Sequence, residues 1–104
     1  MARFKLNPEP TFKAKVGIPI PSTDAFEDVV FEFKYRNRDD AIAWWESVKE
    51  KPVAEAMASM LAGWELDDEF TPENVALLCN NYTGAYPATL EKYLKELTGA
   101  RAKN

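Results

Sequence analysis

The residues best suited to chemistry in this chain are carboxylates, and the densest group lies between residues 65 and 69. Glu65, Asp67, Asp68 and Glu69 follow one another closely there, and neighbouring carboxylates can hold Ca²⁺ or Mg²⁺. Their spacing lacks the Asp-x-Asp-x-Asp-Gly order of a calcium loop. A solvated connector between two helices accounts for the same acidic residues. We therefore predict no metal site in this segment.

The side chains that most enzymes use for acid–base and nucleophilic chemistry are almost missing. The 104 residues include no histidine and a single cysteine, Cys79. Without histidine the chain lacks the usual general base near neutral pH and the commonest transition-metal ligand. One thiol forms neither an internal disulfide nor a Cys-x-x-Cys pair, which favours a reducing compartment. We predict that the protein is not an enzyme and uses no cofactor.

The charge balance argues against two classes of partner. Thirteen basic and 17 acidic residues give a formal net charge of −4, whereas a nucleic-acid binder needs a concentrated basic face. No stretch approaches the roughly 18 to 20 apolar residues that a membrane span requires. We therefore predict neither nucleic acid nor membrane as a partner. An acidic mimic of nucleic acid is a weak alternative, because the charge is modest and the acids are interleaved with lysines.

Large apolar side chains are the remaining candidates for function, as contacts to a partner protein. Tryptophans that are adjacent on a helix point about 100° apart, so one of such a pair can face outward. Methionines form adaptable binding surfaces, although they more often fill core space. Core packing is therefore the competing interpretation for every one of these residues. The candidate partner-binding residues are Trp44, Trp45, Met57, Met60 and Trp64.

Two segments must form strands, because apolar and polar residues alternate along them. The apolar faces comprise Phe12, Ala14, Val16 and Ile18 in residues 11–20, and Val29, Phe31, Phe33 and Tyr35 in residues 28–36. The connection Pro19-Ile20-Pro21-Ser22-Thr23-Asp24 contains two prolines and suits a turn. These features predict an antiparallel hairpin in which Lys13 and Lys15 face Glu32 across the strands.

Apolar residues at helical spacing predict helices in the rest of the chain. The first predicted helix opens at Arg38 and is bounded by Pro52. The second carries apolar residues from Val53 to Trp64, with Gly63 ending or loosening it.

Two further helices have clear boundary signals. Thr71 can cap the third helix, and Pro72 suits its first position because the ring presets φ. The fourth helix accommodates Pro87 in its first turn, where a missing N–H costs little. Gly99 stands where a left-handed C-terminal cap is expected.

These elements predict an α+β domain, with an N-terminal antiparallel β-hairpin followed by about four short α-helices. We divide the chain into a flexible arm at 1–10, a single domain at 11–99 and a basic tail at 100–104. Because a hairpin leaves strand edges unpaired, a homo-oligomer is a candidate assembly.

The order of these motifs resembles the tail assembly chaperones of long-tailed bacteriophages and their prophages. The resemblance covers nearly the whole chain, and its most specific pieces are the connector Trp64-Glu65-Leu66-Asp67-Asp68-Glu69-Phe70 and the ending Ala100-Arg101-Ala102-Lys103-Asn104. Further matching pieces are Phe4-Lys5-Leu6-Asn7-Pro8, Thr11-Phe12-Lys13-Ala14, Phe31-Glu32-Phe33-Lys34-Tyr35, the helix from Asn74 to Tyr82, and Tyr93-Leu94-Lys95-Glu96-Leu97.

The resemblance implies a chaperone that binds the tape measure protein in the host cell cytoplasm, keeps it soluble and promotes tail tube assembly around it. The tail tube protein is a further candidate partner, and the chaperone is expected to be absent from the mature virion. The family has no catalytic residues to carry over. The alternative is a structural tail completion or connector protein that stays in the virion, which mass spectrometry of purified particles would distinguish.

Overall fold

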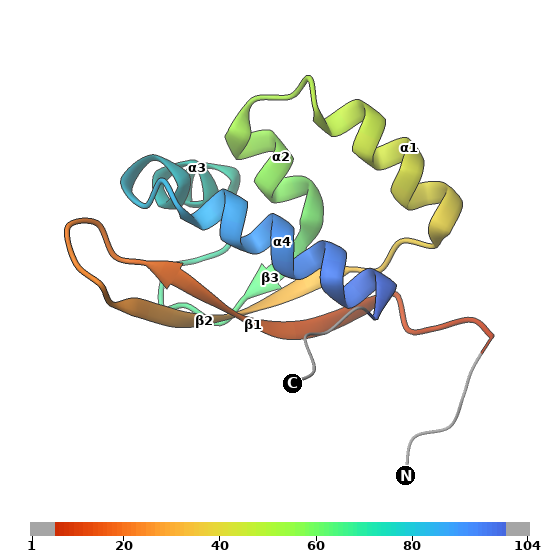
Figure 1. Ribbon diagram of the computed structural model, residues 1–104, viewed down its shortest axis with the longest axis horizontal. Helices are drawn as coiled ribbons and strands as arrows, with labels where there is room; N and C mark the ends of the chain where they lie inside the picture. The colour runs from red at the N-terminus through yellow and green to blue at the C-terminus, as the bar shows by residue number, and fades with distance from the viewer. Residues whose placement is uncertain (1–5, 100–104) are drawn as a thin grey trace, which may run out of the picture.

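A computed structural model describes residues 6–99 of the chain, so the predicted tail at 100–104 lies outside the described residues, as does the first half of the predicted arm. Within residues 6–99, three strands and four helices follow one another along the chain (Figure 1). They are β1 (Thr11–Pro19), β2 (Phe26–Lys34), α1 (Arg38–Val48), α2 (Val53–Met60), β3 (Leu61–Trp64), α3 (Pro72–Asn81) and α4 (Ala85–Thr98). The predicted α+β class is confirmed, with the hairpin at its N-terminal end.

The fold has two layers, a small sheet and a set of helices that covers one of its faces (Figure 1). The sheet has the order β1-β2-β3, and both pairs of neighbours are antiparallel. The alternation read from the sequence selects the covered face. Val16 and Ile18 of β1, and Val29, Phe31 and Phe33 of β2, are all buried against the helices.

The other face of the sheet carries charged side chains. Lys13 lies opposite Glu32 in the register, as expected, but its ammonium group binds Glu65 at 2.9 Å instead. Glu32 accepts a hydrogen bond from the Thr11 hydroxyl at 2.8 Å. The hydrogen bond to Glu65 raises the pKa of Lys13. Because the Lys13–Glu65 pair is more than half exposed on both sides, it adds little to stability.

The second helix is shorter than predicted, because β3 replaces its last turn. Helix α2 ends at Met60, and Leu61 already has extended backbone angles, with φ −113° and ψ 144°. Leu61 pairs with Phe33 and Trp64 with Phe31, across a register shift between Glu32 and Phe33. In a regular strand, residues three positions apart point to opposite faces of the sheet. The register shift lets the Leu61 and Trp64 side chains both point toward the helices. The same spacing is typical of a helix, which explains the error.

The helix boundaries read from the sequence in the second half of the chain are confirmed. The Thr71 side chain accepts a hydrogen bond from the Asn74 amide at 3.1 Å, and Pro72 is the first residue of α3. Helix α4 ends at Gly99, whose φ of 72° is left-handed. Glycine adopts that conformation without the steric cost that other residues meet.

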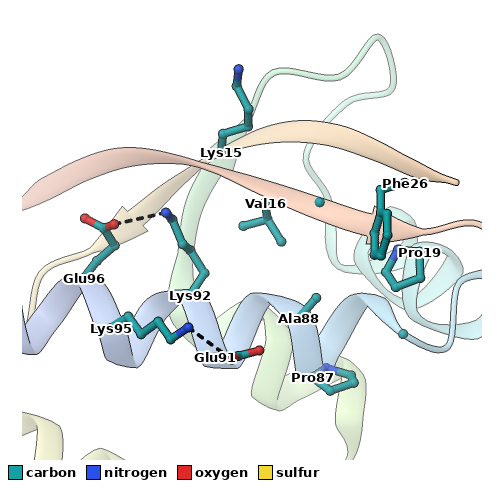
Figure 2. Close-up of a pocket in the computed structure, with 12 residues that line it drawn as sticks. Lys15, Val16, Pro19, Phe26, Pro87, Ala88, Glu91, Lys92, Lys95 and Glu96 are labelled. Carbon is teal, nitrogen blue, oxygen red and sulfur yellow. Dashed lines mark ion pairs between the residues drawn. The ribbon is translucent and has the colours of Figure 1, made fainter. Parts of the chain in front are cut away.

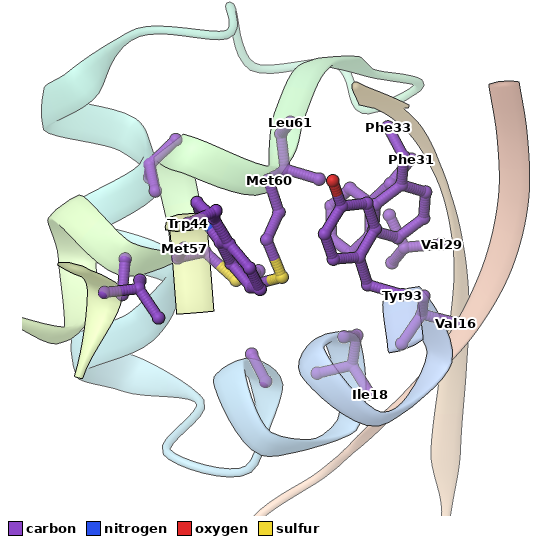
Figure 3. Close-up of a cluster of buried hydrophobic side chains, with 14 residues drawn as sticks. Val16, Ile18, Val29, Phe31, Phe33, Trp44, Met57, Met60, Leu61 and Tyr93 are labelled. Atoms are coloured by element: carbon purple, nitrogen blue, oxygen red, sulfur yellow. The ribbon is translucent and has the colours of Figure 1, made fainter. Parts of the chain in front are cut away.

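Tyr93 lies among the buried side chains between the sheet and the helices (Figure 3). A hydrogen-bonded network around its hydroxyl joins the two layers. Its hydroxyl donates to the Lys34 carbonyl at 2.7 Å and accepts from the Arg36 guanidinium at 2.9 Å. Arg36 also donates to the Ser59 carbonyl at 3.0 Å and lies over the Trp44 ring, 5.2 Å from its centroid. The network thereby ties α4 and α2 to the end of β2, and it holds α1 through Trp44.

One buried side chain in this core lacks a polar partner. Thr89 of α4 is completely buried, and its Oγ1 has no hydrogen-bond partner in the described part of the chain. An unpaired buried hydroxyl costs free energy that a methyl group does not. We expect Thr89→Val to raise the free energy of unfolding by about 1 kcal/mol, measured by urea denaturation. An unchanged or lower value would show that the hydroxyl is satisfied in solution.

Candidate functional site

Three of the five residues predicted to contact a partner lie inside the core. Met57 and Met60 of α2 are completely buried, and Trp44 of α1 is 6% exposed (Figure 3). The Trp44 indole N–H donates to the Ser59 hydroxyl at 2.8 Å, so its polar atom is also satisfied internally. These three side chains serve the packing of α1 and α2 on the sheet, and the structure leaves them no surface for a partner.

The other two, Trp45 and Trp64, reach the surface at different places. Trp45 is 37% exposed on α1, one turn after Ile42, which is 56% exposed. Trp64 is half-buried at the end of β3, where its indole N–H donates to the Asp68 carbonyl at 2.8 Å and its ring meets Phe70 edge-on. The structure therefore does not bring the five residues together, because α1 lies at the opposite end of the helical layer from α3, beside which Trp64 lies (Figure 1).

Exposed apolar side chains lie on either side of α3. Leu77 is 56% exposed and lines two hollows. One, of about 670 Å³, lies between α2 and α3 and includes Val53, which is 51% exposed. The other, of about 210 Å³, includes Trp64 and Leu66. We call Val53, Trp64, Leu66 and Leu77 together the α3 surface.

The local structure of α3 explains why Leu77 faces outward. Thr71 caps the helix, and Val75 is buried while Leu78 packs partly against the core. Leu77 lies about 100° from Leu78 around the helix axis, on the solvent side. Leu77 was not among the residues predicted to contact a partner, because those were chosen by residue type, as tryptophans and methionines. The available signal was an apolar side chain on the otherwise polar face of an amphipathic helix.

The α3 surface carries no arrangement of reactive groups. Cys79 lines the larger hollow, but burial raises the pKa of its thiol, which reduces the reactive thiolate. Among residues 6–99, no group of three or more histidine, cysteine, aspartate or glutamate side chains is placed to hold a metal ion. No helix in that same range is both long and apolar enough to cross a membrane. The exposed side chains of Val53, Leu66 and Leu77 suit this surface to apolar contacts.

Comparison with known proteins gives one match. Searches of curated proteins and of solved structures find no match. A family model described as phage tail assembly chaperone matches residues 1–104, the full length of the sequence. The resemblance noted in the connector and at the C-terminal end is therefore supported along the whole sequence. The chain belongs to the phage tail assembly chaperone family.

Proposed function

We propose that this chain is a non-enzymatic chaperone that binds the tape measure protein, keeps it soluble and promotes assembly of the tail tube around it. The α3 surface is the observation that carries the proposal. A long helical protein exposes apolar stripes before it is packed, and such stripes need a temporary cover.

The shape of the α3 surface suits a helical partner. Leu77 stands between two hollows, so apolar side chains one turn apart on a bound helix can occupy the hollows on either side of it. The rim residues Glu73 and Asn80 are polar and exposed, as expected around an apolar contact. Burial of exposed leucine and valine side chains supplies the free energy of such a complex.

The test is co-expression of this chain with the tape measure protein of the same phage. We expect Leu77→Asp to weaken the soluble complex by about 30-fold or more, because a buried charge would replace a central apolar contact. Binding is measured by titration of the purified proteins, and the recovered soluble tape measure protein provides a second readout.

A matched control is available on another helix. Leu94 of α4 is 36% exposed and lines neither hollow, so Leu94→Asp should leave binding within about twofold while adding the same charge. Circular dichroism must show that both variants are folded. If Leu77→Asp binds normally, or if Leu94→Asp is equally impaired, the α3 surface does not recognise the tape measure protein.

The proposal also places the protein in the host cell cytoplasm and outside the finished particle. A cover over apolar stripes must be removed once the tube subunits bury those stripes themselves. The contact on which it rests is a small group of exposed apolar side chains around two open hollows, and such limited contacts are typical of transient complexes.

A further inference from the structure

We propose that the outer edge of β1, together with the groove between β1 and α4, binds an extended protein segment that alternates apolar and acidic side chains. This site is separate from the α3 surface and uses a different kind of recognition. A bound segment would add a fourth strand to the sheet beside β1.

In the described part of the chain, β1 has a neighbouring strand on one side only. In an antiparallel pair only alternate residues bond to the partner strand. The Tyr35 amide donates to the Pro10 carbonyl at 2.8 Å, and the Ile20 amide donates to the Ala25 carbonyl at 3.0 Å. Even-numbered residues of β1 therefore bond to β2, which directs the amides and carbonyls of the odd-numbered residues away from the sheet. These residues are Thr11, Lys13, Lys15 and Gly17.

These outward backbone groups are available to a new strand. They form no hydrogen bond with any other residue of the range 6–99. Pro10 precedes this stretch and Pro19 ends it, and neither residue has an amide to donate. Natural sheets usually block such an edge with a proline, a bulge or a covering segment. Between its two prolines β1 has none of these devices, although its lysines discourage pairing with another basic strand.

A groove beside this edge can receive side chains of the added strand. It has a volume of about 720 Å³ and lies between β1 and α4 (Figure 2). Val16 points into it from β1 and Ala88 lies on the helix side, while Lys15 points away from the helix (Figure 2). Farther along α4 the lining consists of two ion pairs, Lys92–Glu96 and Lys95–Glu91. Side chains on one face of an added strand would therefore meet apolar groups near Val16 and Ala88, and paired charges farther along the helix.

The other face of the added strand would lie beside lysines. Lys13 and Lys15 are exposed on β1, and the strand carries no acidic residue. Lys15 has no ion pair with any residue that the structure describes. Cross-strand pairs of opposite charge stabilise a sheet, whereas like charges directly opposite destabilise it. Lys13 already binds Glu65 at 2.9 Å, so Lys15 carries most of the preference for an acidic partner. The occupant should therefore place acidic side chains on this face and apolar ones between them.

The same rule disfavours a second copy of this chain as the occupant. If β1 paired antiparallel with β1 of another copy in full overlap, Lys15 would lie directly opposite Lys15 of the second copy. Like charges at that position oppose the pairing. Charge complementarity thus favours a different protein.

The proposal can be tested with a synthetic probe. We would titrate the full chain into an acetylated, fluorescently labelled peptide of nine residues, the length of β1, that alternates glutamate and valine. We expect saturable binding with a Kd below about 1 mM, measured by fluorescence anisotropy. A peptide that alternates lysine and valine should bind about tenfold more weakly. N-methylation of the amides that face β1 should abolish binding.

Variants of the chain show where the peptide binds. Gly17→Pro removes an outward amide but no bond to β2, and a Cβ at this position meets its neighbours at 3.6 Å or more. It should weaken the peptide about tenfold or more, as should Lys15→Glu, which changes charge without changing the backbone. Leu77→Asp should bind the peptide normally, so a failure at the α3 surface and a failure here are distinguishable.

Three results would overturn the proposal. The first is no binding when the chain reaches millimolar concentration. The second is that Gly17→Pro binds the peptide as tightly as the unaltered chain does, and that the unaltered chain binds the N-methylated peptide equally tightly. The third is a concentration-dependent dimer of the chain alone that Gly17→Pro abolishes, since that would assign the edge to a second copy. If Gly17→Pro does not fold by circular dichroism, Lys15→Glu and the N-methylated peptide still decide between binding at the edge and binding elsewhere.

Discussion

Replacing Tyr93 by alanine is expected to lower the free energy of unfolding by about 3–5 kcal/mol. Tyr93 is completely buried. Its ring stacks on Phe33 with centroids 5.4 Å apart and meets Trp44 edge-on at 5.3 Å. Removal of such a ring leaves a cavity between the two layers in addition to the lost apolar burial. A domain of this size has about 5–15 kcal/mol of total stability, so this variant should be close to unfolding.

The hydroxyl of Tyr93 is separable from its ring. Tyr93→Phe keeps the packing but removes the donor to the Lys34 carbonyl and the acceptor for Arg36. We expect this change to cost about 1–3 kcal/mol, because buried groups lose their partners. Urea denaturation measures both variants, and the midpoint should fall while the m-value stays constant.

A second tyrosine provides the control for the hydroxyl. Tyr35 is half-buried, and its hydroxyl has no hydrogen bond within the described residues. Tyr35→Phe should therefore change stability by no more than about 0.5 kcal/mol.

One outcome would contradict the prediction for Tyr93→Ala. If this variant unfolds at the same urea concentration as the wild type, the contacts around the Tyr93 ring do not hold the two layers together.

The sequence was sufficient to predict the elements whose determinants are local. The hairpin follows from the alternation in residues 11–20 and 28–36, which Val30 interrupts in the second run. The start of α3 follows from Thr71 and Pro72, and the end of α4 from Gly99. At both helix ends the deciding interaction joins residues close in sequence, such as the Thr71 side chain and the Asn74 amide.

The strand β3 depended instead on contacts that are distant in sequence. Leu61 and Trp64 have the spacing of a helix, and only the exposed edge of β2 and the register shift beside Glu32 make a strand of them. The same limit applies to Lys13, whose partner Glu65 lies 52 residues away along the chain. A local pattern contains no information about such pairings.

The candidate site was harder to predict than the fold. Residue type suggested tryptophan and methionine, but the core uses Met57, Met60 and Trp44 to fill the space between the layers. The exposed residue on α3 is a leucine, Leu77. Which apolar residues remain outside depends on how many helices cover the sheet and at what angles, and neither quantity can be read from the spacing of one helix.

The adjacent tryptophans of α1 test most directly which apolar side chains are buried and which are exposed. Trp44→Ala should lower the free energy of unfolding by about 3–5 kcal/mol, because its buried ring fills core space. The change also removes the indole hydrogen bond to Ser59 and the contact of Arg36 with the ring. The loss is measured by thermal or urea denaturation monitored by circular dichroism. Fluorescence is unsuitable as the signal, because the substitution itself removes a tryptophan.

Trp45→Ala is the matched variant, one residue away and on the outside of the same helix. Its ring is 37% exposed, so we expect a cost of about 1 kcal/mol or less, with the fold intact. Any effect of this variant on recovery of the tape measure protein then reports on contact rather than on folding. If it impairs recovery while Leu77→Asp does not, the partner binds the exposed side of α1, where Ile42 and Trp45 lie, and not the α3 surface. If Trp44→Ala is as stable as Trp45→Ala, the packing of α1 against the core is wrong, because burial is the property that distinguishes these two neighbouring residues.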